Sequence, residues 1–230
     1  MPRSFVPIPL ARSGHLQTIA GIYWPQTDRV GGIQSSHLVS IGDDGSLAVT
    51  INQNADWKPG QRIVLLIHGL TGSENSGHIV RLSDAFVKRG FLAVRMNMRG
   101  CGPGEGLARG IYHSGRSEDA RAVLEWIGKT YSCSAVTQIG ISLGGNATLK
   151  MAGEYGTNAP DFLDGVVSVS APIDLAASSR RLSRPNNVFF DRYFAVAAIR
   201  HVQTLHERFP DKTPPIPMAL LSGKKTRADR

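Results

Sequence analysis

The chain has 230 residues, of which 41% are hydrophobic and 19% are charged. A chain of this size and composition fits one globular domain with a sizeable core. Two cysteines, Cys101 and Cys133, are too few for a disulfide framework, so a reduced, cytoplasmic protein is expected. No apolar run approaches the roughly 18 residues of a membrane span, and the first residues show no signal-peptide pattern.

The net charge of +8 is concentrated late in the chain, where residues 178–230 hold 11 basic and four acidic residues. A basic segment can bind nucleic acid or anionic lipid. Here the basic residues are dispersed among Phe, Val, Leu and Pro, without an aromatic-basic repeat or a nucleic-acid motif. We therefore expect no nucleic-acid partner.

Short β-prone runs and amphipathic stretches alternate after an opening hairpin. The turn signal Asp43-Asp44-Gly45 predicts the hairpin within 37–51. Further strands are predicted within 63–67, 91–100, 135–141 and 163–172, and helices over 77–90, 117–131 and 143–155. Gly90 is expected to end the first of these helices and Ser117 to cap the second.

This alternation indicates an α/β fold with a mostly parallel sheet and right-handed crossovers. Ligands of such sheets bind beyond the carboxyl ends of the strands. The loops after Ile67, Asn97, Ile141 and Val169 are therefore expected to form the site.

Beyond Ala171 the pattern changes to an inserted, cap-like helical segment over 172–212. One helix face is predicted from Phe194, Ala197, Ala198, Val202 and Leu205. A β-prone run at 216–221 follows it. We expect a single domain over 1–230, with the core strands and helices in 36–171 and an incomplete C-terminal part in 213–230.

The sequence Gly140-Ile141-Ser142-Leu143-Gly144 matches G-x-S-x-G between a predicted strand and a predicted helix. That context is the one a nucleophile elbow requires, because the serine occupies a sharp turn and larger residues on either side would clash. Ser142 is therefore the candidate nucleophile. The alternative is a tight strand-helix turn with an inert serine.

The sequence His68-Gly69-Leu70 follows the predicted buried strand upstream. In this architecture such a loop supplies a backbone N–H to the oxyanion hole. The candidate donors are the amides of Leu70 and Leu143. His68 precedes the serine, against the expected chain order of the triad, and is interpreted as a residue that shapes the loop.

Six local strings carry a more specific signal: GHLQTI at 14–19, LLIHGLTGSENSGHI at 65–79, NMRGCG at 97–102, YHSG at 112–115 with Asp119 shortly after, GISLGGN at 140–146 and SAPIDL at 170–175. In these strings the chain resembles the α/β-hydrolase superfamily and, more narrowly, the YheT-like group of esterases and lipases. The resemblance implies an α/β-hydrolase fold and serine hydrolase chemistry on carboxylic esters. It implies short acyl esters or lipid-like glycerides as substrates, with no metal and no organic cofactor.

The family pattern places the triad acid after a late strand and the base histidine after the last strand. The histidines after Ser142 are His201 and His206, both in the predicted cap helix. The acid candidates are Asp174, which follows the strand after the elbow, and Asp229, which has one residue after it. None fits the pattern well, so the expectation is a C-terminally truncated member whose last strands, acid and base are missing.

Three functional readings stay open from the sequence. The first is an esterase that forms an acyl-enzyme on Ser142. The second is an inactive fragment or pseudoenzyme that keeps the pocket without the chemistry, and the third is an acyltransferase. Cys101 lies in a glycine-rich run, 100–106, that is interpreted as a flexible loop giving substrate access. The acyl length, the alcohol and the oligomeric state are not specified by these motifs.

Overall fold

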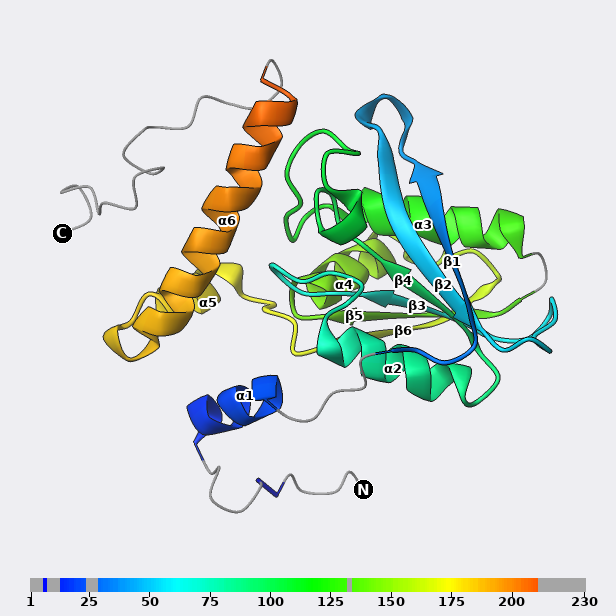
Figure 1. Ribbon diagram of the computed structural model, residues 1–230, viewed down its shortest axis with the longest axis horizontal. Coiled ribbons are helices and arrows are strands. Elements are labelled where there is room, and N and C mark those ends of the chain that lie inside the picture. Colours follow the sequence, from blue (N-terminus) through cyan, green and yellow to red (C-terminus); the bar gives the residue numbers. More distant parts are fainter. Residues whose placement is uncertain (1–5, 8–12, 24–28, 132–133, 211–230) are drawn as a thin grey trace.

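The computed structural model describes residues 6–7, 13–23, 29–131 and 134–210. Within them six strands form one sheet (Figure 1). The strands are β1 (Ile33–Ser40), β2 (Ser46–Gln53), β3 (Ile63–Ile67), β4 (Leu92–Met96), β5 (Val136–Ile141) and β6 (Leu163–Val169). Their order across the sheet is β1-β2-β4-β3-β5-β6, so the chain passes the position of β4 between β2 and β3 and the position of β3 between β4 and β5.

The first two strands are the hairpin, and the other four run parallel to one another. β1 pairs antiparallel with β2, and β2 pairs antiparallel with β4. β4, β3, β5 and β6 pair in parallel. The turn of the hairpin contains the short 3-10 helix η1 (Gly42–Asp44). The next residue, Gly45, has a φ of 113°. The α/β class and the mostly parallel sheet are thus confirmed.

β3 shows why a continuous apolar run becomes a central strand. Successive side chains of a strand point to opposite faces. Ile63, Leu65 and Ile67 belong to one core cluster, and Val64 and Leu66 belong to another. All five residues are buried, because helices cover both faces of the sheet.

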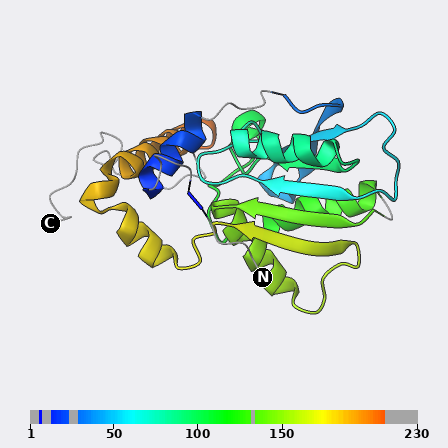
Figure 2. The same cartoon turned by 90° about the horizontal axis from the view of Figure 1, so that it is seen from below.

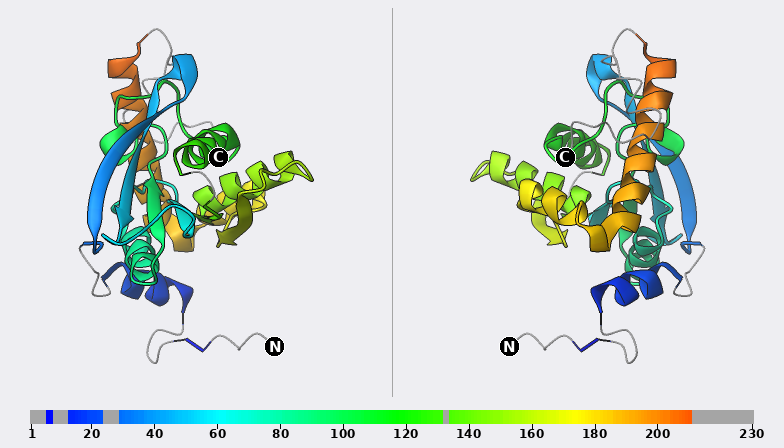
Figure 3. Two further views of the ribbon diagram at one scale, coloured as in Figure 1. Left: turned by 90° about the vertical axis from the view of Figure 1, so that its right-hand side faces the viewer. Right: turned by 90° about the vertical axis from the view of Figure 1, so that its left-hand side faces the viewer.

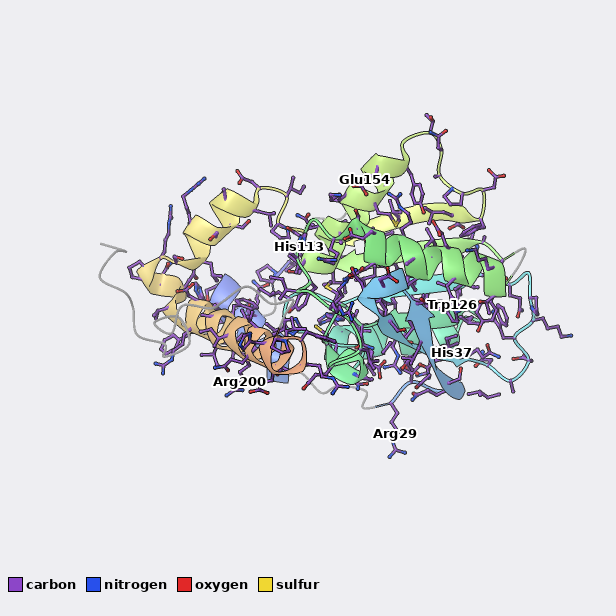
Figure 4. All side chains as sticks on the ribbon, turned by 90° about the horizontal axis from the view of Figure 1, so that it is seen from above. Arg29, His37, His113, Trp126, Glu154 and Arg200 are labelled. Atoms are coloured by element: carbon purple, nitrogen blue, oxygen red, sulfur yellow. The ribbon has the colours of Figure 1, made fainter. Side chains whose placement is uncertain are left out.

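Three helices provide that cover: α2 (Gly77–Val87), α3 (Ser117–Thr130) and α4 (Leu143–Tyr155). α3 and α4 contribute Leu124 and Met151 to the cluster around Leu65, while α2 contributes Ile79 to the cluster on the other face. On the face of β1 that is turned toward α3, His37 lies beside Trp126, with ring centroids 5.5 Å apart (Figure 4).

The expected helix boundaries are confirmed, with one correction. Gly90, just after α2, has a φ of 84°, as a helix-ending glycine does. Ser117 does not cap α3. It is the first residue of the helix, and its hydroxyl donates a hydrogen bond to the Glu154 carboxylate of α4 at 2.5 Å.

Three further helices gather beyond the carboxyl ends of the parallel strands (Figures 2 and 3). They are α1 (Gly14–Tyr23), α5 (Leu175–Leu182) and α6 (Val188–Arg208), with the 3-10 helix η3 (Pro185–Asn187) before α6. α1 joins this group through His15, whose Nε2 lies 3.0 Å from Asn187 Oδ1. The string at 14–19 therefore packs the N-terminal arm onto the start of α6.

The helical segment after β6 confirms the change of pattern predicted beyond Ala171. Of the predicted helix face, Leu205 is buried and Ala198 is exposed. The β-prone run at 216–221, Asp229 and Cys133 lie outside the described residues. Among the helices of the described ranges, none is long and apolar enough to cross a membrane.

Replacing Leu65 by alanine should lower the free energy of unfolding by about 2 to 5 kcal/mol, because the methyl groups leave a cavity between β3 and the helices. Urea-induced unfolding, followed by circular dichroism, measures this change. Leu38→Ala is the matched control, since Leu38 on β1 is 60% exposed. Equal losses in the two variants would contradict the assignment of Leu65 to the core.

Candidate active site

Ser142 joins β5 to α4 in a strained backbone conformation. Its φ is 54° and its ψ is −116°. A non-glycine residue in this region costs roughly 1 to 3 kcal/mol and persists only where the surroundings hold it. Here the Ser142 N–H donates to Val169 O of the neighbouring strand at 2.8 Å, which fixes the turn to the sheet.

The two motif glycines are required by close backbone approaches. A Cβ on Gly140 would lie 2.2 Å from Gly144 O, and a Cβ on Gly144 would lie 2.4 Å from His68 O. Real Cβ atoms do not come this close to a carbonyl oxygen. The sequence argument for glycines on both sides of Ser142 therefore matches the geometry.

The turn after β3 lies directly against Ser142. A Cβ placed on Gly69 would be 3.0 Å from Ser142 Cβ and 3.6 Å from Ser142 Oγ. The turn is closed by the Gly72 N–H, which donates to Gly69 O at 3.1 Å, and Thr71 has a φ of 62°. We call residues Gly69–Gly72 the oxyanion turn.

The two predicted amide donors are the N–H groups of Leu70 and Leu143. Leu143 is the first residue of α4, so its N–H has no intrahelical acceptor. Among the described residues, neither the Leu70 nor the Leu143 N–H has a hydrogen-bond acceptor. In a trans peptide the N–H points away from the C=O. Gly69 O faces Gly72 N and His68 Nδ1, so the Leu70 N–H points away from them.

His68 is a buried structural residue in this arrangement. Its Nε2 accepts the Met98 N–H at 3.1 Å, so Nδ1 carries the proton and donates to Gly69 O at 2.7 Å. Burial lowers the pKa of His68 to about 4, which keeps the ring neutral at neutral pH. With both nitrogens engaged, His68 cannot take the Ser142 proton, in agreement with its predicted role in the loop.

A buried carboxylate supports the far end of the oxyanion turn. Glu74 Oε2 accepts from Thr50 Oγ1 at 2.5 Å and from Asn97 Nδ2 at 2.9 Å. The Glu74 N–H in turn donates to Asn97 Oδ1 at 2.9 Å. These bonds join the loop after β3 to β2 and to the end of β4, and they give the buried side chain polar partners.

A buried ion pair fixes the next loop. Arg99, directly after β4, donates from Nε and Nη2 to Asp119 of α3 at 2.8 Å. Its Nη1 donates to Asp44 at 2.7 Å, and both Arg99 and Asp119 are buried. The sequence strings at 97–102 and 112–115 with Asp119 contain both partners of this ion pair.

The acid and base candidates within the described residues are Asp174, His201 and His206. The Asp174 carboxylate accepts the Ala177 N–H at 2.8 Å and caps α5, and His206 is exposed in the last turn of α6. His201 packs its ring edge-on against Tyr112, with centroids 5.0 Å apart. Among the described residues, none of them hydrogen-bonds to Ser142 Oγ.

A pocket of about 310 Å³ lies between the oxyanion turn, the loop after β4 and α6. Its walls include Thr71, Gly72, Tyr112, Tyr193, Arg200 and His201. Figure 4 labels Arg200 on α6, beyond the carboxyl ends of the strands. Within the described ranges, no three His, Cys, Asp or Glu side chains are grouped as a metal site would require.

Comparison with known proteins places this geometry in context. A family model described as "alpha/beta hydrolase fold" matches residues 62–214. The putative esterase YheT of Escherichia coli is 37% identical over 153 residues, which are 66% of this chain and 44% of that protein. Human phospholipase ABHD3 is 23% identical over 179 residues, 74% of this chain and 42% of that protein. The chain thus spans less than half of the length of these relatives.

A solved structure also has a fold similar to that of this chain. The Pyrococcus furiosus esterase Pf2001 superposes with a TM-score of 0.56 at 18% sequence identity. The match covers 79% of this chain and 73% of that one. At this identity the likeness concerns the fold alone.

Replacing Asp119 by asparagine should lower the free energy of unfolding by about 3 kcal/mol, because Arg99 then keeps a buried charge with its main partner removed. Chemical denaturation measures the loss. The control is Glu118→Gln, which removes an exposed 3.3 Å pair with Arg116 and should cost less than about 1 kcal/mol. Similar losses in both variants would show that the Arg99–Asp119 pair does not anchor the loop.

His68 should make the protein less stable as the pH falls. Burial lowers the pKa of folded His68 from 6.5 to about 4, so the unfolded chain takes up the proton first. The His68 contribution is complete above pH 6.5 and is lost toward pH 4, at up to about 1.4 kcal/mol per pH unit. Unfolding free energies between these pH values should therefore fall less steeply in His68→Gln than in wild type.

His206→Gln is the control for this titration, because His206 is exposed on α6. Its unfolding free energy should follow the wild-type pH dependence. Parallel curves for wild type and His68→Gln would rule out a buried, neutral His68.

Proposed function

Because the chain belongs to the alpha/beta hydrolase fold family, we propose that it is a serine hydrolase that cleaves carboxylic esters through an acyl-enzyme on Ser142. The observation that carries this proposal is the contact between Gly69 and Ser142. It puts a strained serine within a few ångströms of the turn that bears the Leu70 N–H, beside the N-terminus of α4.

The proposed reaction forms an acyl-enzyme and then hydrolyses it. Ser142 Oγ attacks the ester carbonyl carbon while a base takes the hydroxyl proton. The carbonyl oxygen becomes an oxyanion, and the Leu70 and Leu143 N–H groups stabilise its charge together with the dipole of α4. Collapse of the tetrahedral intermediate breaks the bond to the alcohol, which leaves with a proton. Water then attacks the acyl-enzyme and releases the acid and free Ser142.

The substrate class rests on the names of the relatives. They include a putative esterase, a phospholipase and a monoacylglycerol lipase, and each of these names denotes an enzyme that acts on esters. For this chain we propose a short acyl ester or a lipid-like glyceride. The pocket beside the oxyanion turn has both apolar walls and a cationic one, Arg200, which suits a substrate with a polar end.

The domain arrangement is part of the same proposal. Residues 36–171 would form the catalytic core, and 172–212 a cap above the carboxyl ends of the strands. α6 supports this assignment because His201 and Arg200 reach the pocket that borders the oxyanion turn. A cytoplasmic location is proposed from the low cysteine content alone, with Cys101 a buried free thiol.

A second candidate function is a binding protein that keeps the pocket without turnover. The observation in its favour is that, in the described part of the chain, no histidine or carboxylate hydrogen-bonds to Ser142 Oγ. Without a base the serine keeps its proton and is a weak nucleophile. The two candidates differ in whether Ser142 reacts.

Wild-type protein should hydrolyse p-nitrophenyl butyrate and react covalently with a fluorophosphonate probe, and Ser142→Ala should lose both activities by a factor of about 10⁴ or more. Mass spectrometry of the labelled peptide identifies the site. Ser170→Ala is the matched control, since Ser170 also has a positive φ, 52°, at the end of a neighbouring strand. A folded wild-type protein that neither reacts nor turns over would favour the binding protein.

A further inference from the structure

Tyr112 connects the two loops that border the pocket. It lies between the 3-10 helix η2 (Gly102–Gly104) and α3, and its side chain is partly buried. Its hydroxyl accepts the Thr71 N–H at 2.9 Å. The buried thiol of Cys101, in the loop after β4, interacts electrostatically with the same hydroxyl.

The hydroxyl accepts the Thr71 N–H as a neutral group. A neutral tyrosine hydroxyl has lone pairs that accept a hydrogen bond. Burial raises the pKa of Tyr112 above its ordinary value, and burial raises the pKa of Cys101 to about 12. The contact with Thr71 therefore persists over the pH range in which esterases are assayed.

The partner of this hydrogen bond is a strained residue. Thr71 has a φ of 62°, in the left-handed region that residues with a β-carbon rarely adopt. Its N–H belongs to the peptide that follows Leu70. Fixing that peptide limits the rotation of Leu70, whose own N–H lies in the preceding peptide and has no acceptor within the described residues.

We infer that Tyr112 is a positioning residue for the oxyanion turn: its hydroxyl holds the Thr71 N–H and thereby keeps the Leu70 N–H directed at the substrate oxygen. This role rests on the proposed serine hydrolase function. The ring adds a second link, because its edge-on contact with His201 joins the turn to α6. Tyr112 itself need not touch the reacting atoms.

The test is Tyr112→Phe, which keeps the ring and removes the hydroxyl. Removing an oxyanion donor outright costs about 10² to 10³ in kcat. Loosening the Leu70 N–H donor should lower kcat for p-nitrophenyl butyrate by about tenfold. KM should change by less than about twofold, because the bound ground state does not use this donor. The Thr71 amide should also exchange with solvent faster in the variant, which NMR or mass spectrometry detects independently of activity.

Two variants serve as controls. Tyr155→Phe removes a buried hydroxyl that has no hydrogen-bond partner among the described residues, and it should leave kcat and Thr71 exchange unchanged. Cys101→Ala removes the sulfur but leaves the Tyr112–Thr71 bond, so its kcat should fall by less than that of Tyr112→Phe. An equal fall would assign the effect to the loop after β4 and overturn the inference.

The outcomes separate this inference from the proposed function. An unreactive wild-type protein overturns the hydrolase proposal and the positioning role with it. A reactive wild type with unchanged kcat in Tyr112→Phe overturns the positioning role alone. A fall in kcat without faster Thr71 exchange also overturns it, because the effect would then not pass through the oxyanion turn.

Discussion

The contact between two backbone turns is the constraint on which the rest of the site depends. The elbow after β5 and the turn after β3 approach so closely that a methyl group on Gly144 would lie 2.4 Å from His68 O. β3 and β5 are neighbours in the sheet, and Ile67 is paired with Gly140. The strand order therefore brings the serine and the oxyanion turn together before any side chain takes part.

Such close turns would relax if their loops were free. The conformations of Ser142 and Thr71 are both strained, and neither residue is a glycine. The surrounding polar groups prevent relaxation. His68 bridges to Met98, and Glu74 bridges to Asn97, so two side chains tie the loop after β3 to the end of β4. Buried polar groups of this kind are costly unless fully paired, and when paired they specify one arrangement.

The strands and core helices could be predicted from the sequence because their patterns are local. Ile63–Ile67 is a continuous apolar run and became β3 with the same boundaries. The helix predicted over 143–155 is α4, again with the same boundaries. The class of fold and the place of the candidate nucleophile follow from such runs and from the G-x-S-x-G spacing.

What could not be predicted depends on contacts between distant residues. α1 was not foreseen, and its contact from His15 to Asn187 spans 172 positions. Ser117 carries a capping signal in the sequence, yet its hydroxyl donates a hydrogen bond to Glu154 of another helix. The Tyr112–Thr71 bond likewise joins residues 41 positions apart, and no spacing rule identifies it.

The glycine-rich run after β4 has a packing role that its composition does not reveal. The sequence favours an access loop, and Gly100 and Gly102 do line the pocket, but they also permit close packing. A Cβ on Gly100 would lie 2.4 Å from the His201 ring, and one on Gly102 would lie 2.7 Å from Asn97 Oδ1. With φ values of 67° and 53°, both glycines also adopt conformations that other residues avoid.

The packing at Gly100 has a consequence for α6. The ring of His201 on α6 lies over a glycine and edge-on against the Tyr112 ring, and the hydroxyl of the same tyrosine accepts the Thr71 N–H. α6 and the oxyanion turn therefore share one support, so that shape complementarity around a single tyrosine links the helix to the loop after β3.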